Sequence, residues 1–221
     1  MLLFTPACTF VMTGHAALPL TATNGPLIVH HPLSQHRAYC SPPSPPLCSS
    51  NSAMHHALSM QIIELDSTKI LGTVGEPADR SSYTEWLRAN MSLYALQNEM
   101  TLSTAGTANW IRSSMATNLR KRMTQCNMLL GGYDADDGSA SLYFCDYLAT
   151  LHKMPFACHG HASSFILSIF DREWRPNMSL DEAKVVMGKC IAELHKRFMI
   201  SQPNFMIKVV DKDGVRVLEQ E

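Results

Sequence analysis

Helical patterns in this 221-residue sequence come in consecutive pairs, and short strand patterns lie before, between and after those pairs. A Ser-x-x-Glu capping box at 82–85 predicts the start of the first helix, and apolar spacing predicts a second over about 105–123. A second pair is expected over 163–174 and after another capping box at 179–182. Each helix therefore has a helical neighbour in the chain.

The stretches around these helix pairs are β-branched, apolar and bounded by turn residues, which is typical of strands. They predict strands at 61–65, 69–76 and 126–134, an antiparallel pair over 141–157, and a hairpin over 205–219 that turns at "DKDG". A βαβ winding would alternate single helices with strands. The observed order instead predicts an α+β domain in which antiparallel sheets stack and helix pairs cover the outer faces.

The first sixty residues differ in composition from the rest. They contain no Asp or Glu, only Arg37 as a Lys or Arg, eight of the twelve prolines and six of the ten histidines. This shift predicts a Pro/His-rich, low-charge leader over 1–57, disordered or a gene-model error, and a domain over 58–221. The apolar start lacks a basic residue and is interrupted by Pro6, so it matches a signal peptide only in part.

Charge and cysteine content limit the partners that this chain would have. The formal net charge is −1, which gives no overall attraction to nucleic acid, and no apolar run approaches the length of about 18 residues that a membrane span needs. Seven cysteines, without a C-x-x-C pair, favour reduced thiols over a disulfide framework. We therefore expect no nucleic-acid or membrane partner.

The stretch "PFACHGHASS" gathers the residue types of a metal site or a Cys–His nucleophile: Cys158, His159 and His161. A zinc site needs a second ligand cluster, and none has the required spacing. Neighbouring residues on an extended chain point to opposite faces, so Cys158 and His159 would not meet, and no feature favours His195 as the base. The glycines and aspartates of 131–138 are read as turn residues, not as a phosphate or calcium loop. We expect no metal ion and no cofactor.

Several segments, in order and at natural spacing, carry a resemblance to a known family: "ELDSTKILGTVGEPADR", "NMLLGGYD", "LYFCDYLATLHKMPFACHG", "KCIAELHKRF" and "FMIKVVDKDGVR". They resemble the β subunits of the proteasome family of N-terminal-nucleophile hydrolases, and within it the non-catalytic type-2 group at the fourth ring position. The resemblance covers about 58–221. It implies a four-layer αββα sandwich, a place in a seven-membered β ring between an α ring and the opposite β ring, and a location in cytoplasm and nucleus.

The same resemblance allows a test for the catalytic groups of active β subunits. Gln61 falls where active members carry a lysine, and Arg197 falls where they carry a later aspartate. His161 replaces a serine, and "ISQ" at 200–202 stands in place of Ser-Gly-Gly. A threonine nucleophile needs a base and a positive group, which these substitutions remove. The chain is expected to be a structural subunit for protein degradation, with no catalytic residue of its own.

The leader departs from the family, whose first two strands normally occupy that place. Without them an inner sheet would lack two strands and expose an unpaired edge. No Gly-Thr pair lies in the leader, and those at 72–73 and 106–107 lie inside matched elements. Two alternatives stay open: an active threonine peptidase or amidohydrolase freed by N-terminal processing, and a truncated product that does not enter a ring.

Overall fold

The computed structural model describes residues 2–5, 8–15, 62–160, 163–197 and 204–220. Within these residues, ten strands form two five-stranded antiparallel sheets. One sheet has the order β3 (Ile62–Asp66), β4 (Lys69–Gly75), β5 (Cys126–Asp134), β6 (Ser139–Cys145) and β7 (Leu151–Lys153). The other has the order β10 (Gly214–Gln220), β9 (Asn204–Asp211), β2 (Cys8–His15), β1 (Leu2–Thr5) and β8 (Phe156–Ala157).

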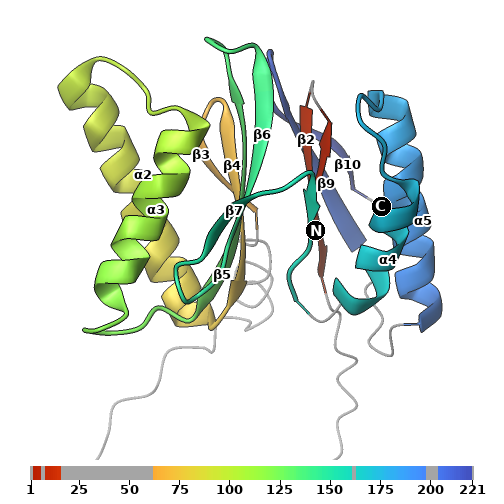
Figure 1. The fold of residues 1–221 in the computed structure, drawn as a ribbon, viewed down its shortest axis with the longest axis horizontal. Helices are drawn as coiled ribbons and strands as arrows, with labels where there is room; N and C mark the ends of the chain where they lie inside the picture. Colours follow the sequence, from red (N-terminus) through yellow and green to blue (C-terminus); the bar gives the residue numbers. More distant parts are fainter. Residues whose placement is uncertain (1, 6–7, 16–61, 161–162, 198–203, 221) are drawn as a thin grey trace, which may run out of the picture.

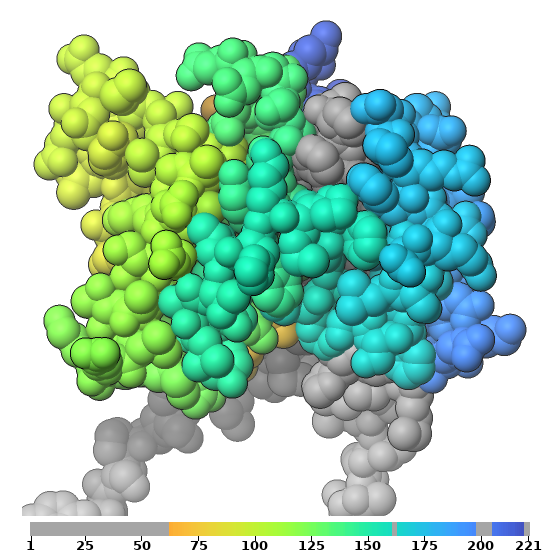
Figure 2. All heavy atoms as spheres, in the orientation of Figure 1, coloured from red at the N-terminus to blue at the C-terminus, as the bar shows by residue number. Residues whose placement is uncertain are grey.

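Two helix pairs lie outside the sheets, which face one another in the middle of the molecule (Figure 1). The first pair, on the β3–β7 sheet, is α2 (Pro77–Asn98) and α3 (Thr104–Asn118). The second pair, on the other sheet, is α4 (Ser163–Glu173) and α5 (Leu180–Arg197). The prediction of an α+β fold with antiparallel sheets is confirmed. In the space-filling view the helix pairs form opposite flanks, and the segment around β6 and β7 lies between them (Figure 2).

Three apolar clusters fill the spaces between these layers. The cluster between the first helix pair and its sheet centres on Leu71, Leu87, Ile111, Met115 and Leu130. The cluster between the sheets includes Ile70, Leu129, Leu142, Ala157 and Val210. The cluster beneath the second helix pair includes Ile166, Phe170, Val186, Cys190, Leu194, Ile207 and Val209. Alternate residues of β4 and β5 thus point into different clusters, which fixes the register of both strands.

The first helix begins earlier than its capping-box pattern predicts. Glu76 is the N-cap, and its carboxylate accepts a hydrogen bond of 2.8 Å from the Asp79 backbone N–H. Pro77 follows at the first helical turn, where its missing N–H has no intrahelical partner to lose. Ser82 therefore lies inside α2, and the prediction of a helix start there is wrong. The turn before the helix needs Gly75, because a Cβ there would lie 2.1 Å from the Gln125 carbonyl oxygen.

The second capping-box prediction is confirmed at the start of α5. The Ser179 N–H donates to the Glu182 carboxylate at 2.8 Å, and the Glu182 N–H donates back to the Ser179 hydroxyl at 3.3 Å. The strand predicted at 126–134 coincides with β5, and the C-terminal hairpin is formed by β9 and β10. α3 ends at Asn118, five residues short of the prediction.

Two strands come from the leader, where none was expected. β1 pairs with β8 and with β2, and all of β2 but its first residue pairs with β9. We expected the first strands to be missing or replaced, with an unpaired edge. The described leader residues supply two strands here, so the expectation of an unpaired edge between β8 and β9 is wrong. Backbone pairing with β8 and β9 supplies partners that lie far away in the sequence, which composition cannot reveal. The remainder of the leader, residues 16–57, lies outside the described part of the chain.

Candidate functional site

The stretch that links β8 to α4 holds Cys158, His159 and His161, the candidates for a metal site or a Cys–His nucleophile. Gly160 has a φ of 90°, in the left-handed region that favours glycine, and its carbonyl accepts hydrogen bonds from the Ser163 hydroxyl at 2.7 Å and N–H at 3.1 Å. These bonds set the start of α4. The predicted strand-to-helix turn is thus confirmed, while His161 lies outside the described residues.

Cys158 and His159 are held in states unsuited to nucleophilic chemistry. Burial raises the pKa of the Cys158 thiol, so the thiol stays protonated. Burial also lowers the pKa of His159 to about 4, and the imidazole stacks on Phe144 with ring centroids 4.2 Å apart. A neutral, stacked imidazole beside a protonated thiol is part of the packing between β6 and the turn, not a thiolate–imidazolium pair.

The positions that bear on catalysis are described only in part. Arg197 is the last residue of α5, and its side chain is exposed and pairs with Glu193 at 2.6 Å. Gln61 and residues 200–202 lie outside the described parts of the chain. The structure thus places one of these predicted substitutions and leaves the others untested.

Neither of the Gly-Thr pairs noted in the sequence offers a free threonine amine. Thr73 is 1% exposed within β4, and Thr107 is fully buried within α3. An N-terminal nucleophile at either position would require cleavage through the middle of a strand or a helix. Each hydroxyl is instead surrounded by the packing of its own layer.

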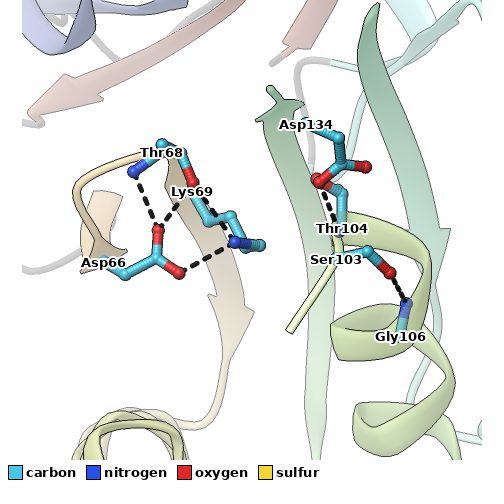
Figure 3. A network of polar contacts seen from close by, with 7 residues as sticks. All are labelled: Asp66, Thr68, Lys69, Ser103, Thr104, Gly106 and Asp134. Atoms are coloured by element: carbon cyan, nitrogen blue, oxygen red, sulfur yellow. Dashed lines mark hydrogen bonds and ion pairs between the residues drawn. The ribbon is translucent and has the colours of Figure 1, made fainter. Parts of the chain in front are cut away.

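A buried lysine occupies the first turn of the β3–β7 sheet (Figure 3). Lys69 is 1% exposed, and its ammonium donates to the Asp66 carboxylate at 2.9 Å and to the Thr68 hydroxyl at 3.2 Å. The other Asp66 oxygen accepts from the Thr68 N–H at 2.8 Å and hydroxyl at 3.1 Å. A charge is costly to bury unless it is paired and hydrogen-bonded, and both conditions are met here.

A second set of polar contacts joins α3 to the end of β5 (Figure 3). Ser103 caps the helix by accepting from the Gly106 N–H, while the Thr104 N–H and hydroxyl both donate to one Asp134 oxygen at 2.8 Å. Gly132, which pairs with Lys69 across the sheet, lies between the two sets. A Cβ at Gly132 would lie 2.5 Å from the Thr104 hydroxyl oxygen and 3.0 Å from Lys69 Cγ.

These two sets of contacts serve folding, because Thr104 is fully buried and Lys69 nearly so, which leaves a substrate no access. Sequence reasoning read residues 66–68 as a simple turn and missed the buried lysine. The usable signal was a lysine at the start of an otherwise apolar strand, directly after the turn residues 66–68.

No group of three or more His, Cys, Asp or Glu side chains within the described part of the chain is arranged to hold a metal ion. Four cysteines are free and buried: Cys126, Cys145, Cys158 and Cys190. Burial raises the pKa of Cys190 to about 12 and those of Cys126 and Cys145 to about 11. Among the helices that the structure describes, none is long and apolar enough to cross a membrane.

The described residues thus form an α+β domain of two stacked antiparallel sheets between helix pairs. Its buried polar groups stabilise turns and helix starts. The family model for proteasome subunits matches residues 48–210. The chain belongs to the proteasome subunit family.

Curated relatives agree with this family over most of their own lengths. Proteasome subunit beta type-2-B of Arabidopsis thaliana is 45% identical over 175 residues, which cover 77% of this chain and 87% of the relative. Proteasome subunit beta type-2 of Oryza sativa subsp. japonica is 45% identical over 74% of this chain and 76% of its own length. Proteasome subunit beta type-4 of Saccharomyces cerevisiae is 31% identical over 71% and 79%.

Proposed function

We propose that this chain is a non-catalytic, structural β subunit of the 20S proteasome core, folded as a four-layer αββα sandwich of the N-terminal-nucleophile hydrolase type. The observation that carries the proposal is the similarity to β subunits named type-2 over three quarters of the chain. The order of helix pair, sheet, sheet and helix pair agrees with it (Figure 1). Its role is to help enclose the chamber in which other subunits cut protein chains.

The chemistry of the chain supports a structural role over a peptidase role. A threonine nucleophile depends on a nearby base and a positive charge, and Gln61 would supply neither. Arg197, where active relatives carry an aspartate, brings the opposite charge and is engaged with Glu193 on an exposed helix end. Thr73 and Thr107, the threonines that follow glycine, are enclosed in secondary structure. No side chain of this subunit is assigned to peptide cleavage.

The proposed partners are the neighbouring β subunits of a seven-membered ring, the subunits of the α ring and those of the opposite β ring, in cytoplasm and nucleus. Closed rings of this kind use heterologous interfaces, in which different faces of each subunit meet. Apolar side chains are exposed along α2 and just after it, where an interface would cover them: Trp86, Leu93, Leu96 and Met100.

Size-exclusion chromatography of the tagged full-length chain, expressed in its own cells and affinity-purified, tests the assembly. We expect co-elution with other proteasome subunits in a complex of several hundred kilodaltons. Elution as a monomer alone would instead favour a truncated product that does not enter a ring.

N-terminal sequencing of the incorporated chain tests the non-catalytic assignment. We expect a mature start at a residue other than Thr, Ser or Cys, and no loss of any of the core's peptidase activities when Arg197 is replaced by Lys. A mature start at Thr, Ser or Cys, together with labelling of this subunit by a covalent threonine-peptidase inhibitor, would overturn it in favour of the amidohydrolase alternative.

A further inference from the structure

A pocket of about 340 Å³ lies where β3, the C-terminal half of α2 and the connection from α2 to α3 meet. α2 contributes four residues that share one face of the helix: Arg88, Met91, Ser92 and Ala95. The other wall is the end of β3 with its turn, residues 64–67. The volume lies in the lower part of the range for pockets that hold small molecules.

The pocket has an apolar floor and a polar rim. Leu65 and Met91 are 4% and 6% exposed and belong to the apolar cluster between the first helix pair and its sheet. Ser92 and Thr101 are exposed and place their hydroxyls nearer to solvent. A ligand with an apolar body would remove apolar surface from water at the floor and find hydrogen-bonding groups at the rim.

Three charged side chains line the pocket, and two of them are already paired. The Asp66 carboxylate accepts from the buried Lys69 at 2.9 Å (Figure 3), and the Glu64 carboxylate accepts from Lys208 of β9 at 2.6 Å. Arg88 is exposed and takes part in none of the ion pairs within the described part of the chain. Three cations against two carboxylates leave one positive charge, and Arg88 carries it.

We propose that this pocket binds a small carboxylate with a short apolar body, as the C-terminal end of a peptide or an aliphatic acid would supply. The carboxylate pairs with the Arg88 guanidinium, whose planar fork of N–H groups matches two carboxylate oxygens. The apolar body lies on Leu65 and Met91, and Ala95 leaves room for it because its side chain is a single methyl group.

Two other occupants fit the pocket less well. A cationic ligand would have to take Asp66 from Lys69, whose side chain is 2% exposed and would become an unpaired buried charge. The leader of this chain cannot supply a side-chain carboxylate, because residues 1–60 contain no Asp or Glu. A carboxylate delivered from solution therefore matches the charge of the pocket best.

The inference goes beyond the proposed ring function, because it assigns a ligand to a pocket that an interface on α2 does not need. Ser92 and Ala95 line the pocket, and Leu93 and Leu96, each one position later, are exposed apolar residues. Successive residues are about 100° apart around a helix axis. A subunit that covers the two leucines would thus approach α2 from a different side.

Methyl NMR of the full-length chain with isotope-labelled methionine tests the proposal. The probes are N-acetyl-leucine, which carries a carboxylate, and N-acetyl-leucinamide, which has nearly the same shape without the charge. We expect N-acetyl-leucine to shift the Met91 methyl signal saturably, while the amide leaves it in place. The signal is assigned by its loss in Met91→Leu, and the fully buried Met187 of α5 serves as the unmoved reference.

A pair of arginine variants tests the charge. Arg88→Gln should weaken the binding of N-acetyl-leucine about fivefold, because an exposed ion pair of good geometry is lost. Arg120→Gln removes an exposed arginine outside the pocket and should stay within about twofold of the wild type. Equal binding of the acid and the amide, or equal affinities of the two variants, would overturn the proposal.

Filling the pocket is a second test that leaves Arg88 in place. Ala95→Leu adds side-chain atoms to the α2 wall and should abolish the response of Met91 to N-acetyl-leucine. Ala89→Leu makes the same change at an exposed α2 position outside the pocket and should bind as the wild type does. Both substitutions introduce a good helix former, so circular dichroism should show an intact fold. Unchanged binding by Ala95→Leu would also overturn the proposal.

Hexanoate, titrated in the same way, identifies the source of the carboxylate. Tighter binding of N-acetyl-leucine indicates a peptide end, whose amide group uses the hydroxyls at the rim, and tighter binding of hexanoate indicates an aliphatic acid. The titration needs no assembled ring, so it separates the two proposals. Loss of ring incorporation with normal binding would contradict only the proposed function, and normal incorporation with no response of Met91 would contradict only the carboxylate pocket.

Discussion

At the scale of single residues, the junction of β4, β5 and α3 depends on a few buried groups with no spare room. The Lys69 ammonium is satisfied by Asp66 and Thr68, and the Thr104 hydroxyl is satisfied by Asp134. Gly132 lies between them and keeps the two sets of contacts at their distances. The junction therefore tolerates neither an added side-chain atom nor the loss of one charged partner.

Gly132→Ala should destabilise the protein by about 1–3 kcal/mol, because the new Cβ overlaps the Thr104 hydroxyl oxygen and the helix start must shift. Urea unfolding followed by circular dichroism measures the free energy of unfolding. The matched control is Gly188→Ala on α5, where a Cβ meets nothing within 4 Å. That control should gain about 0.5–1 kcal/mol from helix propensity. Equal stability of Gly132→Ala and wild type would contradict the close packing.

His159 should make stability depend on pH. Burial lowers its pKa to about 4 in the folded protein, from an ordinary value of 6.5. Between these values the unfolded chain binds more protons, so the free energy of unfolding should fall as the pH drops through this window. The expected loss attributable to His159 is about 2 kcal/mol between pH 7.5 and pH 5.

Urea midpoints at pH 7.5 and pH 5 check this prediction. His159→Gln should flatten the difference between the two pH values, whereas His152→Gln, at an exposed position on β7, should retain it. A pH dependence that survives unchanged in His159→Gln would show that other groups cause it.

At the scale of elements, helix starts depend on which side chain caps the backbone, and sequence patterns do not always identify it. Two Ser-x-x-Glu patterns are present, and only the one at 179–182 begins a helix. At the other helix, the Glu76-Pro77 step sets the start because proline fits the first turn and the glutamate accepts the orphan N–H of Asp79. The earlier start leaves Ser82 within the helix.

Replacement of these two serines by alanine distinguishes a cap from an interior position. Ser179→Ala should cost about 1 kcal/mol of unfolding free energy through loss of the cap. Ser82→Ala should change it by no more than about 0.5 kcal/mol, since the side chain lies on an exposed helix face. Thermal unfolding of both variants in one buffer compares them. A larger loss at Ser82 would restore the sequence-based helix start.

At the scale of the whole molecule, the leader strands complete the second sheet. β2 has neighbours on both sides, β9 along all but its first residue and β1 along half, so it is an inner strand. Without β1 and β2, the sheet would be divided between β9 and β8, and the edges of these two strands would be unpaired. The described leader residues therefore belong to the fold rather than to a separate tail.

Val11→Pro tests the inner position of β2. Val11 pairs with Leu2 of β1 on one side and with Lys208 of β9 on the other. Proline has no N–H, so it removes a hydrogen bond between strands whether the Val11 N–H points to β1 or to β9. We expect a loss on the order of 3 kcal/mol or more, or failure to fold. Val11→Thr keeps the N–H and the β-branched shape and should behave like the wild type. Unchanged stability of Val11→Pro would place residues 8–15 outside the sheet.

Much of this molecule followed from local sequence patterns. The α+β class, both helix pairs, the strand at 126–134 and the C-terminal hairpin were predictable because each depends on neighbours within a few residues. The turn at Cys158–Gly160 was likewise read correctly as the approach to a helix. The wrong start of α2 arose where two local signals competed and the Glu-Pro step was overlooked.

The sequence by itself determined the class of fold, the order of its elements and, through its similarity to proteasome subunits, its family. Tertiary structure decided the rest: that leader residues 2–5 and 8–15 form inner strands, that Lys69 is buried in an ion pair, and that Gly132 must have no side chain. Each of these depends on atoms brought together from distant parts of the chain. Such contacts are set by packing and backbone pairing in three dimensions, which local propensity and composition do not encode.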